Sequence, residues 1–328
     1  MKSKASRMTA SPAHIDPRKL KALSRLSPWR TALALAADWS VIALAIAIAE
    51  WSGSWLVYIV MIPVIAGGMH GLGALMHEFA HFRFVANKRW SDAIGDVFVA
   101  WPLLATTTGY RRNHLDHHRY TSTDKDPDWI LKVGTRQFTF PQEMRFALLN
   151  VLGYFVGVSS VRDMRAALHR IQADNPANRG YKIARLSYYL CLIAAFVALG
   201  WWQEALLYWL VPYSTLFFLF LYVRVVAEHF GPGLTGEGEL GKTRTVIPNF
   251  LEAWFLAPHG LNYHIEHHLY PSVPFYRLGD LHRTLMQDEH FAARAHITRG
   301  YLTGLLGEIW LDGWRRQSGQ TGRAIPAE

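Results

Sequence analysis

The chain has 328 residues, of which 51% are hydrophobic and only 18% are charged, against about a quarter charged in typical soluble domains. This composition favours a protein that uses lipid as its solvent. The 34 lysines and arginines outnumber the 25 acidic residues, but they flank apolar runs and form no basic stripe beside a recognition helix. We therefore expect no nucleic-acid partner.

The first segment, residues 1–30, is polar and basic. It has no short apolar core followed by a cleavage site, so we expect no secretory signal and a basic segment that stays in the cytoplasm. The single cysteine, Cys191, falls inside an apolar stretch. We therefore expect neither a disulfide framework nor a thiolate metal site.

Four apolar segments follow, each near the roughly 20 residues that cross a bilayer. They cover residues 31–50, 53–76, 183–202 and 205–226. Only a few residues join the first to the second and the third to the fourth, so each pair predicts a transmembrane helical hairpin. Two hairpins return the chain to the side where it started, which places both termini and the metal site in the cytoplasm, most simply at a bacterial inner membrane.

Three weaker apolar runs cover residues 93–105, 146–161 and 250–257. They are too short or too interrupted to span, so we expect helices that lie along the membrane surface or pack beneath the cap. Strand alternation of useful length is missing, which favours an all-α protein. We expect one membrane domain over residues 31–315 and a disordered tail over 316–328.

Three short clusters hold eight of the sixteen histidines. In chain order they are His77-Glu78-Phe79-Ala80-His81, His114-Leu115-Asp116-His117-His118 and His264-Ile265-Glu266-His267-His268. Helix positions three or four apart share a face, so each cluster can aim at least two imidazoles at one point. A tetrahedral zinc needs only three or four ligands, whereas iron accepts imidazole at higher coordination, so we expect two metal ions under a cytoplasmic helical cap.

The remaining histidines differ in their surroundings. His229 ends the fourth apolar segment at the membrane level of His81, which makes it a ninth candidate ligand. His259 is undecided. The others stand in polar surroundings, and we expect them to be solvated: His14, His169, His282, His290 and His296.

The pattern of the first cluster, His77-Glu78-x-x-His81, is also that of zinc proteases, in which the glutamate is the general base. An intramembrane zinc protease would leave six clustered histidines unused. A metal-binding receptor without catalysis is a further alternative. Metal analysis separates these alternatives from a two-iron enzyme.

The three boxes, their order and the four spans resemble the membrane fatty acid desaturase and hydroxylase superfamily, from about residue 30 to about residue 285. The stretch Asp126-Pro127-Asp128 after box two and residues 262–271 around box three are also similar to stretches of acyl-lipid desaturases. The resemblance implies two irons that use dioxygen to oxidise an unactivated C–H bond in a lipid, most simply by desaturating a fatty acyl chain. A lipid, alkane or carotenoid hydroxylase or ketolase on the same scaffold remains open.

The resemblance also implies partners and ligands. The chain has no His-Pro-Gly-Gly haem motif, so electrons would come from a separate donor such as a ferredoxin with its reductase, and zinc could replace iron on overexpression. The implied metal ligands are His77, His81, His114, His117, His118, His264, His267 and His268, with His229 as the extra histidine. Neutral imidazole ligands leave carboxylates to orient them through hydrogen bonds, and the candidates are Glu78, Asp116, Asp126, Asp128, Glu228 and Glu266.

Two further features concern charge. Arg111, Arg112, Arg119 and the basic stretch up to Arg185 suit either docking of an acidic electron carrier or anionic headgroup, or plain anchoring at the membrane surface. Asp38 and His70 lie at similar depths in the first and second spans. Because an unpaired ionisable group is costly there, we expect the two side chains to face each other.

Overall fold

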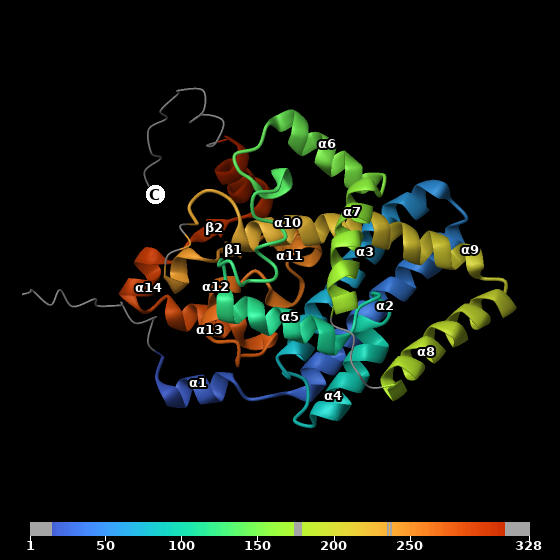
Figure 1. Cartoon of the computed structure of the whole chain (residues 1–328), viewed down its shortest axis with the longest axis horizontal. Helices are drawn as coiled ribbons and strands as arrows, with labels where there is room; N and C mark the ends of the chain where they lie inside the picture. Colours follow the sequence, from blue (N-terminus) through green and yellow to red (C-terminus); the bar gives the residue numbers. More distant parts are fainter. Residues whose placement is uncertain (1–14, 174–178, 235, 237, 312–328) are drawn as a thin grey trace, which may run out of the picture.

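The computed structural model describes residues 15–173, 179–234, 236 and 238–311. Helices make up most of this chain, as predicted (Figure 1). Among the described residues, four helical stretches are long and apolar enough to cross a membrane. They are α2 (Pro28–Ser52), α3 (Trp55–Ala80), α8 (Arg179–Ala198) and the continuous stretch Trp202–His229. These coincide with the four predicted segments, whereas the predicted tail over 316–328 lies outside the described residues.

The first hairpin joins α2 to α3 through only two residues. Pro28 occupies the first turn of α2, where its missing N–H costs nothing, and Gly53 ends the helix at φ 58°, a left-handed conformation suited to glycine. At the tip, Trp51 and Trp55 are 90% and 68% exposed. Such rings favour the boundary between lipid and water, which agrees with a tip at the membrane surface.

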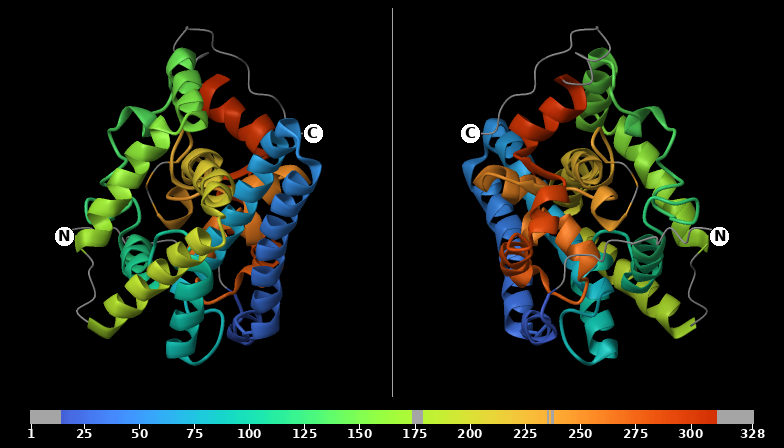
Figure 2. Two further views of the ribbon diagram at one scale, coloured as in Figure 1. Left: turned by 90° about the vertical axis from the view of Figure 1, so that its right-hand side faces the viewer. Right: turned by 90° about the vertical axis from the view of Figure 1, so that its left-hand side faces the viewer.

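The second hairpin is less packed. Helix α8 stands away from the body of the protein, and its apolar window is 0% buried, the surface expected of a helix whose solvent is lipid (Figure 2). Its polar contacts to the body include a hydrogen bond from the Tyr189 hydroxyl to the Trp101 carbonyl, 2.9 Å long, and one from the Trp101 ring N–H to the Tyr181 hydroxyl, 3.2 Å long. The partner stretch comprises α9 (Trp202–Ala205), two π-helical segments at Leu206–Leu210 and Tyr213–Phe217, and α10 (Phe218–His229).

Between the hairpins, short helices connect the spans. Helix α4 (Lys88–Gly95) runs into a π-helical turn at Asp96–Ala100, and α5 (Thr107–Tyr120) carries box two. Helices α6 (Met144–Phe155) and α7 (Val158–Ala173) are bent by 83° at a break that contains Gly157, whose φ is 80°. This bend divides the predicted run over 146–161.

After α10 the chain forms the part that carries box three. Strand β1 (Thr245–Ile247) pairs in parallel with β2 (Ile297–Arg299), with Thr245 opposite Ile297. Helices α12 (His264–Leu269), α13 (Leu278–Leu285) and α14 (Glu289–Arg294) gather at the end of the molecule opposite α9 (Figure 1). The remaining helical elements are α1 (Pro17–Leu23), α11 (Phe250–Leu256), 3-10 turns at Arg136–Phe138, Glu239–Gly241, Pro258–Gly260 and Phe275–Arg277, and π-helical turns at Tyr301–Leu305 and Gly307–Leu311.

The core lies along α3, whose residues from Ile65 to Ala80 are buried with one exception, Met76. Its glycines permit close packing on two sides. A Cβ atom at Gly68 would lie 2.6 Å from Ile42 of α2, and one at Gly67 would lie 3.1 Å from the Trp254 ring of α11. The end of α3 that carries box one is therefore held between the first span and the segment that precedes box three.

Candidate metal centre

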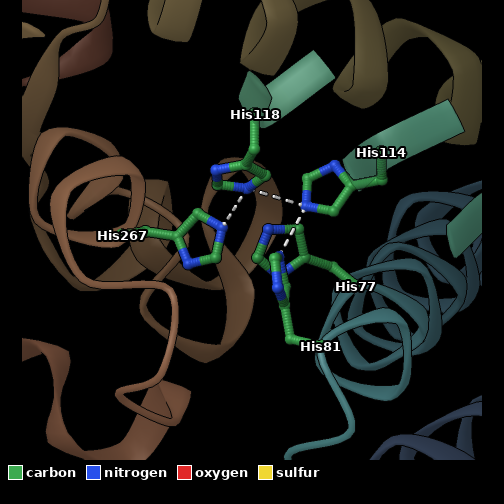
Figure 3. A group of neighbouring side chains, drawn as sticks. All are labelled: His77, His81, His114, His118 and His267. Carbon is green, nitrogen blue, oxygen red and sulfur yellow. Dashed lines mark hydrogen bonds between the residues drawn. The ribbon is translucent and has the colours of Figure 1, made fainter. Parts of the chain in front are cut away.

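Nine histidines meet in two groups at the ends of α3 and α10 and along α5 and α12. Within each group, one ring nitrogen from every member lies within 4.8 Å of the others. The first group is His77, His81, His114, His118 and His267, and it is drawn in Figure 3. The second group is His117, His229, His264 and His268. These are the eight box histidines and the predicted ninth.

Helical geometry explains how each box divides between the groups. On α5, His114 and His118 are four positions apart and share a face, which points to the first group, while His117 points to the second. On α12 the division is reversed, because His264 and His268 belong to the second group and His267 to the first. The repeated His-x-x-His-His spacing therefore serves two neighbouring sites.

The ring nitrogens are spaced as metal ligands would be. In the first group, the His114 Nε2 lies 2.8 Å from the His81 Nε2 and 3.1 Å from the His118 Nε2. In the second, the His264 Nε2 lies 2.8 Å from the His229 Nε2 and 3.0 Å from the His268 Nε2. Ligands at right angles on a metal, at metal–nitrogen bonds of about 2.1 Å, are about 3 Å apart.

Hydrogen bonding alone leaves several of these nitrogens unsatisfied. In the described part of the chain, both ring nitrogens of His77 are buried without a partner, as are the Nδ1 atoms of His229, His264 and His267. Buried polar atoms of this kind are rare in proteins and call for an explanation, and for the His77 ring, which faces the first group, a missing ion supplies one. Both histidine groups are therefore able to hold a metal ion.

The electrostatics also suit metal binding. Burial, followed by the nearby charges of Arg83 and Arg111, lowers the pKa of His81 to about 4. Burial, followed by the neighbouring His81 and His117, lowers the pKa of His118 to about 2. The pKa values of His114, His264, His267 and His268 also lie well below the usual range, again chiefly because of burial. At neutral pH these rings are uncharged and keep a lone pair for a metal.

One carboxylate directly orients a box histidine. His117 donates its Nδ1 hydrogen to Asp126, whose oxygens lie 2.9 and 3.0 Å away, and this leaves the lone pair on Nε2 facing the second group. Asp126 is buried and also accepts hydrogen bonds from the backbone N–H groups of Ser122, Asp128 and Trp129. The loop after box two therefore fixes the carboxylate.

Two other carboxylates lie close to box histidines without bonding to them. The Glu78 Oε1 is 3.7 Å from the His77 Nδ1, and its Oε2 accepts a hydrogen bond from the backbone N–H of Phe275 at 3.0 Å. The Glu228 Oε1 is 3.6 Å from the His264 Nδ1 and 3.0 Å from the Arg224 Nε. Both carboxylates are buried, Glu78 beside the first histidine group and Glu228 beside the second.

Of the other three carboxylates, Glu266 and Asp128 contact residues outside the two histidine groups, and a role in orienting a box histidine stays a prediction. Glu266 points away from the rings and accepts hydrogen bonds from Thr245 and from His282, which was expected to be solvated. Asp128 contacts Lys132 and Asn113. Asp116 is half-buried, and among the described residues no box histidine is seen to donate a hydrogen bond to it. Positions next to a ligand on a helix point to other faces, so adjacency in sequence does not bring a carboxylate to the ring.

The predicted pairing of Asp38 with His70 is wrong. The Asp38 Oδ2 lies 2.8 Å from the Nε2 of His259, the histidine left undecided by the sequence. His70 instead bonds through Nδ1 to the Phe255 carbonyl, 2.8 Å away. The segment before box three packs against α2 and α3 and supplies both groups with partners that are more than 180 residues away in sequence.

A cavity of about 50 Å³ adjoins the second group. Its polar lining includes Tyr110, Lys132, Arg224 and Glu228 in addition to box histidines. Tyr110, Lys132 and Arg224 were not among the site residues predicted from the sequence. The position of Arg224 inside an apolar span could have indicated it, because a guanidinium there is costly and marks a functional or paired position.

The helical membrane scaffold and its buried histidine groups define a histidine-box membrane oxidoreductase. The chain belongs to the fatty acid desaturase family, whose model matches residues 53–300. The predicted resemblance is thereby confirmed, and the proteolytic alternative is set aside.

Several characterised proteins are similar to this chain. Dihydrorhizobitoxine desaturase of Bradyrhizobium elkanii is 28% identical over 83% of this chain and 80% of its own length. The chloroplastic omega-6 fatty acid desaturase of Glycine max is 21% identical over 83% of this chain and 65% of its own length. The sn-1 acyl-lipid omega-3 desaturase (ferredoxin) of Nostoc is 24% identical over 74% of this chain and 70% of its own length.

Proposed function

We propose that this protein binds two iron ions and uses dioxygen to introduce a double bond into a fatty acyl chain of a lipid. The observation that carries the proposal is the division of nine buried histidines into two adjoining groups. Zinc in tetrahedral protein sites takes four ligands, so a group of five imidazoles favours a metal of higher coordination. Iron fits this donor set, with five ligands for one ion and four for the other.

Iron, when bound, supplies the oxidising power that removes hydrogen from an unactivated C–H bond with dioxygen. The protein's own residues hold the metal ions and orient the ligand rings. Neutral histidine rings keep their lone pairs free, Asp126 fixes the tautomer of His117, and burial excludes water from the site. The balance is a CH2–CH2 unit plus dioxygen, two electrons and two protons, giving CH=CH and two waters.

The electrons require a donor, which we propose to be a separate ferredoxin with its reductase. Support comes from the Nostoc relative, whose name specifies ferredoxin. We also propose that the histidine end of the spans faces the cytoplasm of a bacterium, where such a donor is found. The basic residues Arg111, Arg112 and Arg119 lie on α5 beside box two, and Arg111 pairs with Asp92.

A second candidate substrate has a specific observation behind it. The relative with 28% identity is named for dihydrorhizobitoxine and not for a fatty acid. Desaturation of that molecule is therefore an alternative on the same metal centre. Hydroxylation of a lipid, in place of desaturation, also remains compatible with the site.

The test has two arms. Iron and zinc are measured on the purified protein, with about two metal ions per chain expected, and iron is restored where zinc has replaced it. Lipids are then profiled, and dihydrorhizobitoxine is supplied as a second substrate, in a host with the gene and with a His117→Ala variant. New double bonds in acyl chains, seen only with the unmodified gene, support the proposal. Conversion of dihydrorhizobitoxine without a change in the lipids supports the alternative, and a protein that binds no metal would refute both.

A further inference from the structure

We propose that Asp38 and His259 are positioning residues for the metal centre. Their hydrogen bond ties the loop that leads into box three to the first membrane span, and so holds the box-three helix α12 opposite box one. This inference rests on the proposed metal centre. It assigns a role to two groups outside both histidine groups.

The pair lies in an apolar part of the molecule, with Asp38 buried and His259 half-buried. Asp38 lies in α2 with its side chain 5% exposed, and the His259 side chain is 15% exposed. The 2.8 Å contact joins the Asp38 Oδ2 to the His259 Nε2. An ionisable group inside a membrane span is costly unless it is paired, so Asp38 constrains the position of His259 strongly.

The backbone at His259 supports a functional constraint. His259 has φ 54° and ψ 36°, a left-handed conformation that is uncommon for residues other than glycine and persists only when its surroundings require it. The next residues set the start of α12. The Tyr263 N–H donates to the Gly260 carbonyl at 3.1 Å, and the His267 N–H donates to the Tyr263 carbonyl at 3.0 Å.

A second route leads from His259 to box one. The His259 ring packs edge-on against the Phe275 ring, with centroids 5.1 Å apart. The Phe275 backbone N–H donates to the Glu78 Oε2, and the other oxygen of Glu78 lies 3.7 Å from the His77 Nδ1. A displacement of His259 would therefore reach both box three and the carboxylate beside box one.

The close approach of α2 and α3 supplies a precise probe. A Cβ atom at Gly71 of α3 would lie 2.5 Å from the Asp38 Oδ1 and 2.7 Å from its Cγ, so an alanine there must displace the carboxylate. At Gly73, two residues further along α3, an added Cβ would meet only a Phe217 ring atom at 3.8 Å. Gly71→Ala and Gly73→Ala are therefore a matched test and control.

The experiment uses the full-length protein in detergent micelles. Cobalt(II) is titrated into the metal-free protein, and affinity and the visible absorption spectrum, which reports coordination geometry, are recorded for each variant. We expect Gly71→Ala to lower affinity about tenfold, as loss of an orienting group does, and to alter the spectrum. Gly73→Ala should match the unmodified protein.

Substitutions of His259 keep the test decisive if Gly71→Ala fails to fold. His259→Gly allows the left-handed backbone but removes the hydrogen bond to Asp38, so we expect it to lose affinity as Gly71→Ala does. His259→Gln can place an amide N–H near the former Nε2 and should recover part of the loss. Full affinity with an unchanged spectrum in His259→Gly would overturn the inference, whereas failure of the unmodified protein to bind cobalt would refute the proposed metal centre itself.

Discussion

His117 of box two donates its Nδ1 hydrogen to Asp126, nine residues later in the chain, at 2.9 Å. The same carboxylate accepts three backbone N–H groups, so its position is determined by the loop and not by the metal site. This relationship fixes which nitrogen of His117 is available to the second histidine group.

Asp126→Asn should weaken metal binding by the second group. The amide cannot supply the negative charge that holds the His117 N–H, and the loss of such a partner typically costs about 10–100-fold in metal affinity. Metal content after dialysis against a graded chelator measures the effect. Asp124→Asn, at an exposed acid two residues earlier, is the control, and equal affinity in the two variants would contradict the assignment.

His267→Ala and His268→Ala should remove ligands from different groups. Each should abolish formation of the oxidised product, and each should reduce the bound metal to about one ion per chain, because the other group is intact. Metal analysis and lipid profiling of membranes check the two effects. His290→Ala, outside both groups, serves as the control. Full activity in His267→Ala or His268→Ala would show that the replaced histidine is not a metal ligand.

Glu78→Gln should preserve both metal ions and part of the activity. Glu78 accepts a hydrogen bond from the Phe275 N–H, which a glutamine oxygen can also accept, and it lies 3.7 Å from the His77 ring nitrogen without bonding to it. Product formation and metal content are measured together. Complete loss of product with both ions retained would argue for a direct chemical role of this carboxylate.

The metal-free protein should lose stability as the pH falls below 6.5. Burial lowers the pKa of His81 to about 4 and that of His118 to about 2, from 6.5 in the unfolded chain. Between these values the unfolded chain binds more protons than the folded one, so the free energy of unfolding rises with pH in this window and declines on acidification. Thermal unfolding of the metal-free protein across this range checks the direction, and a midpoint that does not change would refute it.

Arg224→Met should be strongly destabilising. The guanidinium and the Glu228 carboxylate are both buried, with Arg224 Nε 3.0 Å from Glu228 Oε1, and removal of one partner leaves an uncompensated charge that typically costs about 3–5 kcal/mol. The double variant Arg224→Met/Glu228→Gln should regain part of this stability. Thermal unfolding in detergent measures both variants, and equal midpoints for the single and double variants would count against a coupled pair.

Local sequence determined the helical framework and the identity of the site. A membrane span is read from about 20 consecutive apolar residues, and a histidine box from spacings of three and four on one helix face, so neither depends on distant contacts. These rules also predicted the placement of His229 at the level of His81. Asp126 was among the six carboxylates expected to orient a ligand, and its hydrogen bond to His117 agrees with that expectation.

Only the tertiary structure decided which boxes share a site and which polar groups pair. Asp38 bonds to His259 across 221 residues, and His70 bonds to a carbonyl 185 residues away, because the segment before box three packs against the first hairpin. Equal depth along the two spans predicted His70 as the partner of Asp38, but depth says nothing about the direction in which a side chain points. Pairing depends on direction around each helix and on the elements packed between, and the missing side chain of Gly71 leaves the space that Asp38 occupies.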